Sequence, residues 1–153
     1  SKEDFLKKPR DVYGVLKLKS ENYIIKNYKK YCILRLFNVY GKNQPESYFV
    51  PDLKKKVSLD KIIHIDNSVR DFLHVHNVVK AINLMIQKKV VGIINVGSGR
   101  ATKLKSIIKK IAFKMKKKPR LKLLNKKTQL VADISLLKSY GIKFIKNEKN
   151  FNF

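Results

Sequence analysis

The chain has 153 residues, of which 44% are hydrophobic, so it can build a core without disulfides or metals, and disorder is excluded as its main state. It has one cysteine, Cys32, and no stretch of the roughly 20 apolar residues that cross a bilayer, so we expect a cytoplasmic protein without membrane segments. Lys and Arg number 36 against 11 Asp and Glu, a formal net charge of +25 that would normally suggest a polyanionic partner.

The predicted elements alternate in type along the chain, which indicates a mixed α/β fold. The first half predicts a helix at 11–28, a strand at 31–37, a loop at 38–47, a short amphipathic helix at 47–57, and strands at 61–66 and 71–75. The second half predicts a helix capped by Asn77, a strand at 93–96, a turn at 97–99, a helix capped by Thr102, a strand at 121–124, and a short helix at 133–141.

The most informative short pattern is Tyr13-Gly14-Val15-Leu16-Lys17. Residues four apart share a face of a helix, so the phenol of Tyr13 and the ammonium of Lys17 can face the same site. A nearby cation stabilises a phenolate, which would let Tyr13 exchange a proton with a carbinol oxygen at neutral pH. The spacing alone is weak, because the chain has seven Tyr and many Lys.

Four motifs in register give this pattern its context. PRDVYGVLKLKSE at 9–21, ILRLFNVYG at 33–41, VRDFLHVHNVV at 69–79 and INVGSG at 94–99 occur in the order and spacing of the extended short-chain dehydrogenase/reductase superfamily. The chain most resembles the NAD-dependent epimerase/dehydratase branch, which acts on nucleotide sugars, and it matches only the C-terminal half of that family. The resemblance implies an α/β fold: the C-terminal part of a Rossmann-like domain together with the small substrate-binding lobe.

The resemblance also implies roles for five residues. Tyr13 resembles the catalytic acid/base, and Lys17 the cation that assists it and hydrogen-bonds the nicotinamide ribose of NAD(P). Phe37 and Asn38 resemble the segment that lines the nicotinamide and the substrate diphosphate. Arg70 resembles the cation that grips the diphosphate of the sugar nucleotide, although the residues alone permit an ion pair with Asp71 or Asp66 equally well.

The domain organisation implied by the resemblance is discontinuous. Residues 1–45 are expected to be the end of the Rossmann-like domain, and residues 46–153 mainly the substrate lobe, with 69–98 returning to the Rossmann-like sheet. Lacking its other neighbours, the strand at 31–37 would expose an edge, which predicts a partner such as a complementary Rossmann half or a second copy.

The chain also departs from the family pattern. Leu16 stands where Ser is common before the motif Lys, and His76-Asn77 replaces an acidic pair. No G-x-x-G-x-x-G turn for the cofactor pyrophosphate precedes Tyr13, so NAD(P) would be bound mainly by a part outside this sequence. The turn at 97–99, GSG, lacks the third Gly of a dinucleotide site, and we interpret it as a strand-to-helix turn.

The sequence gives weaker support to two other classes of function, a metal site and a polyanion-binding module. His64, His74 and His76 lack a convincing further ligand, so no metal site is expected. A non-catalytic basic module for nucleic acid or another polyanion is the alternative function, carried by the lysines after residue 100. Most cations are Lys rather than Arg and the whole chain is rich in Ile and Asn, so we favour a solvated basic face and do not expect nucleic acid as partner. The leading hypothesis is therefore a truncated or split NAD(P)-dependent epimerase, dehydratase or reductase of nucleotide-diphosphate sugars.

Overall fold

A computed structural model describes residues 2–3 and 11–144 and has the mixed α/β character that the sequence predicts. Its elements, in chain order, are α1 (Val12–Asn27), β1 (Cys32–Leu36), β2 (Asn38–Tyr40), α2 (Phe49–Ser58), β3 (Ile63–Asp66), β4 (Val69–Arg70), β5 (Phe72–His74), α3 (Val75–Gln87), β6 (Gly92–Val96), β7 (Thr102–Lys103), α4 (Leu104–Lys114), β8 (Leu121–Leu124), β9 (Gln129–Leu130) and α5 (Ser135–Ser139).

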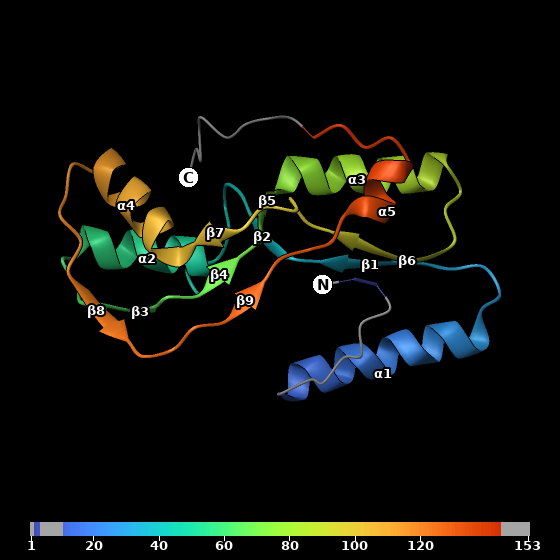
Figure 1. Cartoon of the computed structure of the whole chain (residues 1–153), viewed down its shortest axis with the longest axis horizontal. Coiled ribbons are helices and arrows are strands. Elements are labelled where there is room, and N and C mark those ends of the chain that lie inside the picture. The colour runs from blue at the N-terminus through green and yellow to red at the C-terminus, as the bar shows by residue number, and fades with distance from the viewer. Residues whose placement is uncertain (1, 4–10, 145–153) are drawn as a thin grey trace.

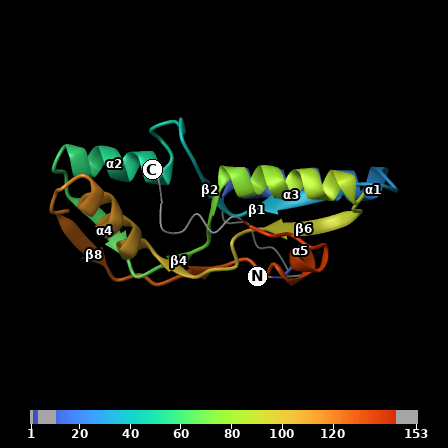
Figure 2. The same ribbon diagram turned by 90° about the horizontal axis from the view of Figure 1, so that it is seen from above.

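The strands of the described residues form small sheets rather than one large one. Three are parallel pairs, β1 with β6, β2 with β5 and β3 with β8, and the fourth has the order β7-β4-β9. The elements separate into two lobes along an elongated molecule (Figure 1), and the same two lobes are seen from above (Figure 2). The short strands β2, β4, β5 and β9 lie between the lobes and connect them.

The lobe drawn at the left of Figure 1 contains α2, α4, β3 and β8. The apolar side chains of α4 recur at helical spacing, so that Ile107, Ile108 and Ile111 all face the core and are almost completely buried. Each such side chain contributes roughly 1.5–3 kcal/mol by leaving water. They pack with the buried residues of α2 and β3, and with Tyr40 and Phe72.

The other lobe is built around β1 and β6 and has α3 on one face. Its buried cluster includes Ile94 and Val96 of β6, Ala81 and Met85 of α3, and Leu137 of α5. On the opposite face lies α1, and none of its residues is buried. Outside α1, no further described element covers this side of the lobe.

Exposed apolar side chains are frequent in α1, in β1 and in the turn before β6. Parallel strands normally have both faces and both edges covered by other elements, but here the described residues pair β1 with β6 alone. The exposed apolar residues of α1, β1 and the turn before β6 are Val12, Tyr13, Val15, Leu16, Tyr23, Ile25, Leu36 and Val91. The combination is typical of a surface that another unit covers.

The predicted helices and strands are confirmed, with corrections at several ends. The predicted loop at 38–47 is wrong at its start, because Asn38–Tyr40 forms β2 beside β5. Asn77 is not an N-cap; α3 begins earlier, and His74 Nδ1 accepts a hydrogen bond from the backbone N–H of His76 at 3.3 Å. Thr102 is not an N-cap either, since it lies in β7. Within the described part of the chain, no helix combines the length and apolar character needed to cross a bilayer.

Candidate active site

The helix α1 brings Tyr13 and Lys17 together. It begins after Asp11, whose side chain caps it by accepting a hydrogen bond from the backbone N–H of Gly14 at 2.7 Å. One turn apart on this helix, the Nζ of Lys17 lies 5.4 Å from the centroid of the Tyr13 ring. The two side chains therefore share a face, as the four-residue spacing predicts.

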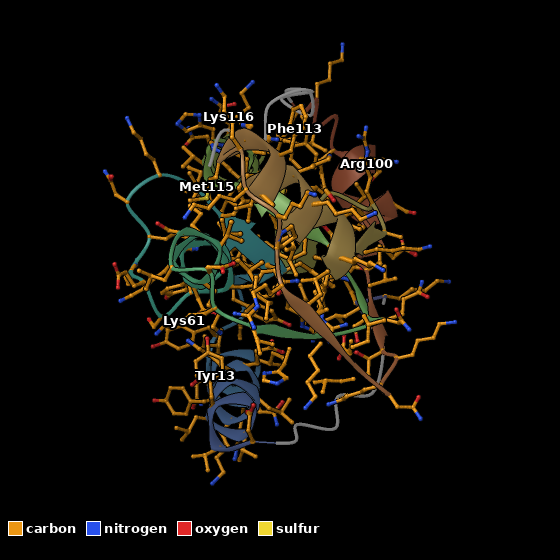
Figure 3. All side chains as sticks on the ribbon, turned by 90° about the vertical axis from the view of Figure 1, so that its left-hand side faces the viewer. Tyr13, Lys61, Arg100, Phe113, Met115 and Lys116 are labelled. Carbon is orange, nitrogen blue, oxygen red and sulfur yellow. The ribbon has the colours of Figure 1, made fainter. Side chains whose placement is uncertain are left out.

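The Tyr13 phenol is open to approach. Its side chain is 70% exposed, and Figure 3 shows it projecting from α1. The ammonium of Lys17 lies over the ring of Tyr13 in this arrangement. A phenol with a cation next to it can exchange a proton with a hydroxyl group brought to this surface.

An ion pair fixes the position of α1 against β1. Arg35 Nε and Nη2 donate to the two carboxylate oxygens of Glu21 at 3.1 and 3.0 Å. Both side chains are largely shielded from water, which makes the bidentate contact stronger than an exposed pair. The N-terminal end of α1 consequently lies on the same side of the lobe as the carboxyl ends of β1 and β6, which is the side where α/β sheets bind ligands (Figure 1).

Phe37 and Asn38 follow directly from the end of β1. The backbone N–H of Phe37 donates to the carbonyl of Val96 at 3.1 Å, which continues the β1–β6 pairing by one residue. The Phe37 side chain is half-buried and packs against the cluster under α3. The Asn38 side chain donates from Nδ2 to the carbonyl oxygen of Asp71 at 2.8 Å. Asn38 is thus tied to the segment that carries Arg70.

Arg70 lies on β4, and its guanidinium is held by neighbouring backbone and a hydroxyl group. Nη1 donates to the carbonyl oxygens of Val69 at 2.9 Å and Thr128 at 3.2 Å, and Nη2 donates to Thr128 Oγ1 at 2.7 Å. Among the described residues, no ion pair joins Arg70 to Asp71 or to Asp66, so that interpretation is not supported. Hydrogen bonds from the side chain and backbone of Ser68 are the main reason why the pKa of Asp66 lies below its usual value.

Asp71 has a structural role that the sequence analysis missed. Its buried carboxylate accepts hydrogen bonds from Ser98 N at 2.7 Å, Ser98 Oγ at 2.6 Å, Gly99 N at 2.9 Å and Ala132 N at 3.2 Å. A methyl group at Gly97 would come within 2.7 Å of Asp71 Oδ2, so the turn approaches too closely for a side chain there. No local signal in the sequence marks this contact, because Asp71 and the 97–99 turn are far apart along the chain.

The hydrogen bonds to Asp71 occupy the backbone donors that a phosphate at the 97–99 turn would need. Backbone N–H groups in a Gly-rich turn can cradle a pyrophosphate, but those of Ser98 and Gly99 already donate to the Asp71 carboxylate. The turn therefore does not fit a dinucleotide diphosphate, which agrees with its interpretation as a structural turn.

The candidate residues thus form two groups. Tyr13 and Lys17 lie together on α1, and Asn38 is linked through Asp71 to the segment of Arg70. In the part of the chain that the structure describes, no hydrogen bond or ion pair joins the first group to the second.

His74 and His76 lie on different elements. The strand β5 ends at His74, and His76 belongs to α3. Their rings nevertheless contact edge to face at 4.8 Å between centroids. Burial, followed by the charge of His76, lowers the pKa of His74. Within residues 2–3 and 11–144, no three His, Cys, Asp or Glu side chains gather in a way that could hold a metal ion.

Comparisons with known proteins agree on one family. The model of the NAD dependent epimerase/dehydratase family matches residues 1–97. The dTDP-4-dehydro-6-deoxyglucose reductase of Escherichia coli is 32% identical over 127 residues, which cover 76% of this chain and 40% of that protein.

Solved structures extend the likeness to nearly the whole chain. The UDP-glucuronic acid 4-epimerase from Bacillus cereus in complex with NAD has a TM-score of 0.80 and 28% identity, with 95% of this chain and 51% of that chain covered. The UDP-N-acetylglucosamine 4-epimerase from Methanobrevibacter ruminantium has a TM-score of 0.80 at 24% identity, covers 96% of this chain and 52% of that chain, and shows the likeness in fold. The chain therefore spans about half the length of these solved structures.

Proposed function

The chain belongs to the NAD dependent epimerase/dehydratase family, and from that membership we propose that it is part of an NAD(P)-dependent epimerase, dehydratase or reductase of nucleotide-diphosphate sugars. It contributes the Tyr–Lys pair and much of the substrate lobe. The observation that carries the proposal is the pairing of Tyr13 with Lys17 on the open face of α1. The single cysteine, Cys32, supports a reducing compartment such as the cytoplasm.

Tyr13 is the proposed acid/base. It takes a proton from a sugar hydroxyl, or returns one to the oxygen, while the positive charge of Lys17 stabilises the phenolate. NAD(P), when bound, supplies the hydride acceptor or donor, and we assign Lys17 to the hydrogen bond with its ribose. Lys17 can serve both purposes because its ammonium has three donors and a flexible stem.

The second group of residues holds the substrate. We assign Arg70 to the diphosphate, since a guanidinium offers paired donors that match phosphate oxygens. Asn38, fixed by its bond to the Asp71 carbonyl, and Phe37 at the end of β1 line the path between Arg70 and the nicotinamide. The domain boundary proposed near residue 45 separates the Tyr13 helix from most of the substrate lobe.

A complementary Rossmann half is the proposed partner on the uncovered face. It would add strands to β1, cover the apolar side chains of α1, and supply the pyrophosphate seat that the described residues lack. Isolated two-stranded sheets are marginally stable in water, which supports such a cover. A homodimer through α1 is the other arrangement that would bury this surface.

Ligand binding tests the proposal against the polyanion alternative. The chain is titrated calorimetrically with UDP-glucose, UDP-glucuronic acid and dTDP-glucose, and separately with single-stranded RNA, at 50 and 200 mM salt. We expect saturable, base-dependent binding of a sugar nucleotide that Arg70→Ala weakens. Binding of RNA alone, falling steeply with salt, would instead favour the polyanion alternative carried by the lysines after residue 100.

Catalysis is tested in the chain combined with a Rossmann half taken from the Bacillus cereus relative. Tyr13→Phe removes the proton-transferring oxygen and keeps the ring, so we expect sugar conversion to fall by about a hundredfold or more while sugar-nucleotide affinity stays within about twofold. Tyr23→Phe, a second exposed tyrosine of α1, is the matched control and should retain activity. Equal activity of Tyr13→Phe and the wild type would refute the acid/base role.

A further inference from the structure

The guanidinium of Arg70 is fixed by one residue that is remote in the sequence. Thr128 accepts from Arg70 twice, through its carbonyl oxygen at 3.2 Å and through its hydroxyl oxygen at 2.7 Å. The pairing of β4 with β9 makes this possible, because the backbone N–H of Val69 also donates to the Thr128 carbonyl at 2.8 Å. An Arg side chain without such contacts would lose conformational entropy when a ligand fixed it, and these contacts reduce that loss.

The Thr128 hydroxyl is itself oriented by Ser68, which is completely buried. The two hydroxyl oxygens lie 2.8 Å apart, and the backbone N–H of Thr128 donates to Ser68 Oγ at 3.0 Å. Because Thr128 Oγ1 accepts from Arg70, its own hydrogen is available for Ser68 Oγ. Every group in this chain of hydrogen bonds then has a complementary partner, which fixes the direction of the Thr128 oxygen.

The contacts leave part of the guanidinium available. An Arg side chain has five N–H donors, and the three contacts to Val69 and Thr128 use at most three of them. The Nε–H and one Nη2–H have no hydrogen-bond partner among the described residues. These neighbouring donors are the pair with which Arg binds two oxygens of one phosphate.

We propose that Thr128 is a positioning residue that presents the remaining fork of Arg70 to the diphosphate of the substrate. This inference rests on the proposed function, since it takes Arg70 as the diphosphate ligand. It goes beyond that function by assigning a positioning role to Thr128, which directly precedes β9. Thr128 does not contact the ligand and acts through Arg70.

The test is a double-mutant cycle on the whole chain with UDP and dTDP as calorimetric probes. Thr128→Val keeps the shape of the side chain and removes the hydroxyl, and we expect it to weaken diphosphate binding about tenfold. Thr128→Ser keeps the hydroxyl and should bind within about twofold of the wild type. In the Arg70→Ala background, Thr128→Val should cause no further loss, because its effect passes through the guanidinium.

Thr102→Val is the matched control. Thr102 lies opposite Arg70 on the other neighbouring strand, β7, and no hydrogen bond joins its hydroxyl to the guanidinium in the described structure. It should bind the probes as the wild type does. Circular dichroism checks each fold, and if Thr128→Val does not fold, the comparison of Thr128→Ser with Thr128→Ala replaces it.

The outcomes separate this inference from the proposed function. If Arg70→Ala weakens binding but Thr128→Val does not, or if Thr128→Val weakens binding equally with and without Arg70, the positioning role is overturned and the diphosphate site stands. If neither probe binds the wild type, or if Arg70→Ala leaves binding unchanged, the diphosphate role of Arg70 fails and the positioning role with it.

Discussion

Arg35 of β1 and Glu21 of α1 form a bidentate ion pair, with Nε to Oε1 at 3.1 Å and Nη2 to Oε2 at 3.0 Å. Because α1 has no buried residue, this pair is a principal contact between the helix that carries Tyr13 and the rest of the protein. Glu21→Gln should therefore loosen α1 by about 1.5–3 kcal/mol, the usual contribution of hydrogen bonds to a charged group. Amide hydrogen exchange of α1 measures this loss.

The exposed pair of Glu46 with Lys55 is the control for that substitution. Glu46→Gln should leave stability nearly unchanged, because water and salt screen such an exposed contact. If both variants changed exchange in α1 equally, or neither did, Glu21 would not be the anchor of the helix.

We expect a large loss of stability when Asn replaces Asp71. Asp71→Asn keeps the shape but directs an NH₂ group toward backbone N–H donors, so at least one donor of the 97–99 turn or Ala132 loses its acceptor. We expect the free energy of unfolding to fall by about 2–4 kcal/mol, measured by urea denaturation. Asp133→Asn is the comparison, because among the described residues Asp133 accepts hydrogen bonds from Ser135, including Ser135 N at 2.9 Å, and the Asn side-chain oxygen can keep that backbone bond. A loss for Asp71→Asn no greater than for Asp133→Asn would contradict this role.

The turn beside Asp71 is also limited by space. A Cβ at Gly97 would lie 2.5 Å from the Cβ of Ala132, closer than packed carbons tolerate. Gly97→Ala should therefore destabilise the protein by about 1–3 kcal/mol, as overpacking does. Adding Ala132→Gly removes the nearest atom, so the double variant should recover part of the loss relative to the sum of the single variants in thermal unfolding. Simple additivity of the two changes would argue against the contact.

His74 predicts a dependence of stability on pH. Burial first, and then the charge of His76, lowers the pKa of His74, and its Nδ1 accepts the His76 N–H at the start of α3. A lowered pKa means that the folded protein binds the proton less well than the unfolded chain. The contribution of neutral His74 to the stability of the folded protein is therefore present above the ordinary histidine pKa of about 6.5. It is lost as the pH falls below that value.

His74→Asn tests this dependence, because Asn retains a capping oxygen that does not titrate in this range. Urea unfolding between pH 5 and 8 should show a smaller loss of stability at low pH for His74→Asn than for the wild type. The exposed His64 provides the control variant, His64→Asn, which should keep the wild-type profile. If the pH dependence of stability in His74→Asn matched that of the wild type, His74 would not be its cause.

The sequence predicted the elements well where one pattern dominates. The apolar run before Phe37 became β1, and the helical spacing through Ile107, Ile108 and Ile111 became α4. Cap positions were less predictable, since a cap depends on where the chain turns. Asn77 had the preferred side chain for a cap, but it is buried inside α3 because the strand before it ends at His74.

Contacts between segments far apart in the chain could not be predicted from the sequence. The spacing of Tyr13 and Lys17 predicted a shared face, because both lie on one helix. Nothing local indicated that Thr128 would meet Arg70, 58 residues away, or that Asp71 would bond Ala132, 61 residues away. Short strands such as β4 and β9 contain two residues each, too few for an alternation pattern to mark them.

The parallel strand pairs join segments far apart in the chain, and this slows folding. Cys32 pairs with Gly92, and Ile63 with Leu121, so long loops must close before these strands gain any contact energy. A topology dominated by such remote pairings belongs to the slow range of folding, on the order of milliseconds to seconds. During that interval newly synthesised strands stay unpaired and can associate with other chains, so a chaperone should raise the yield of native protein more than it would for a helical bundle of equal size.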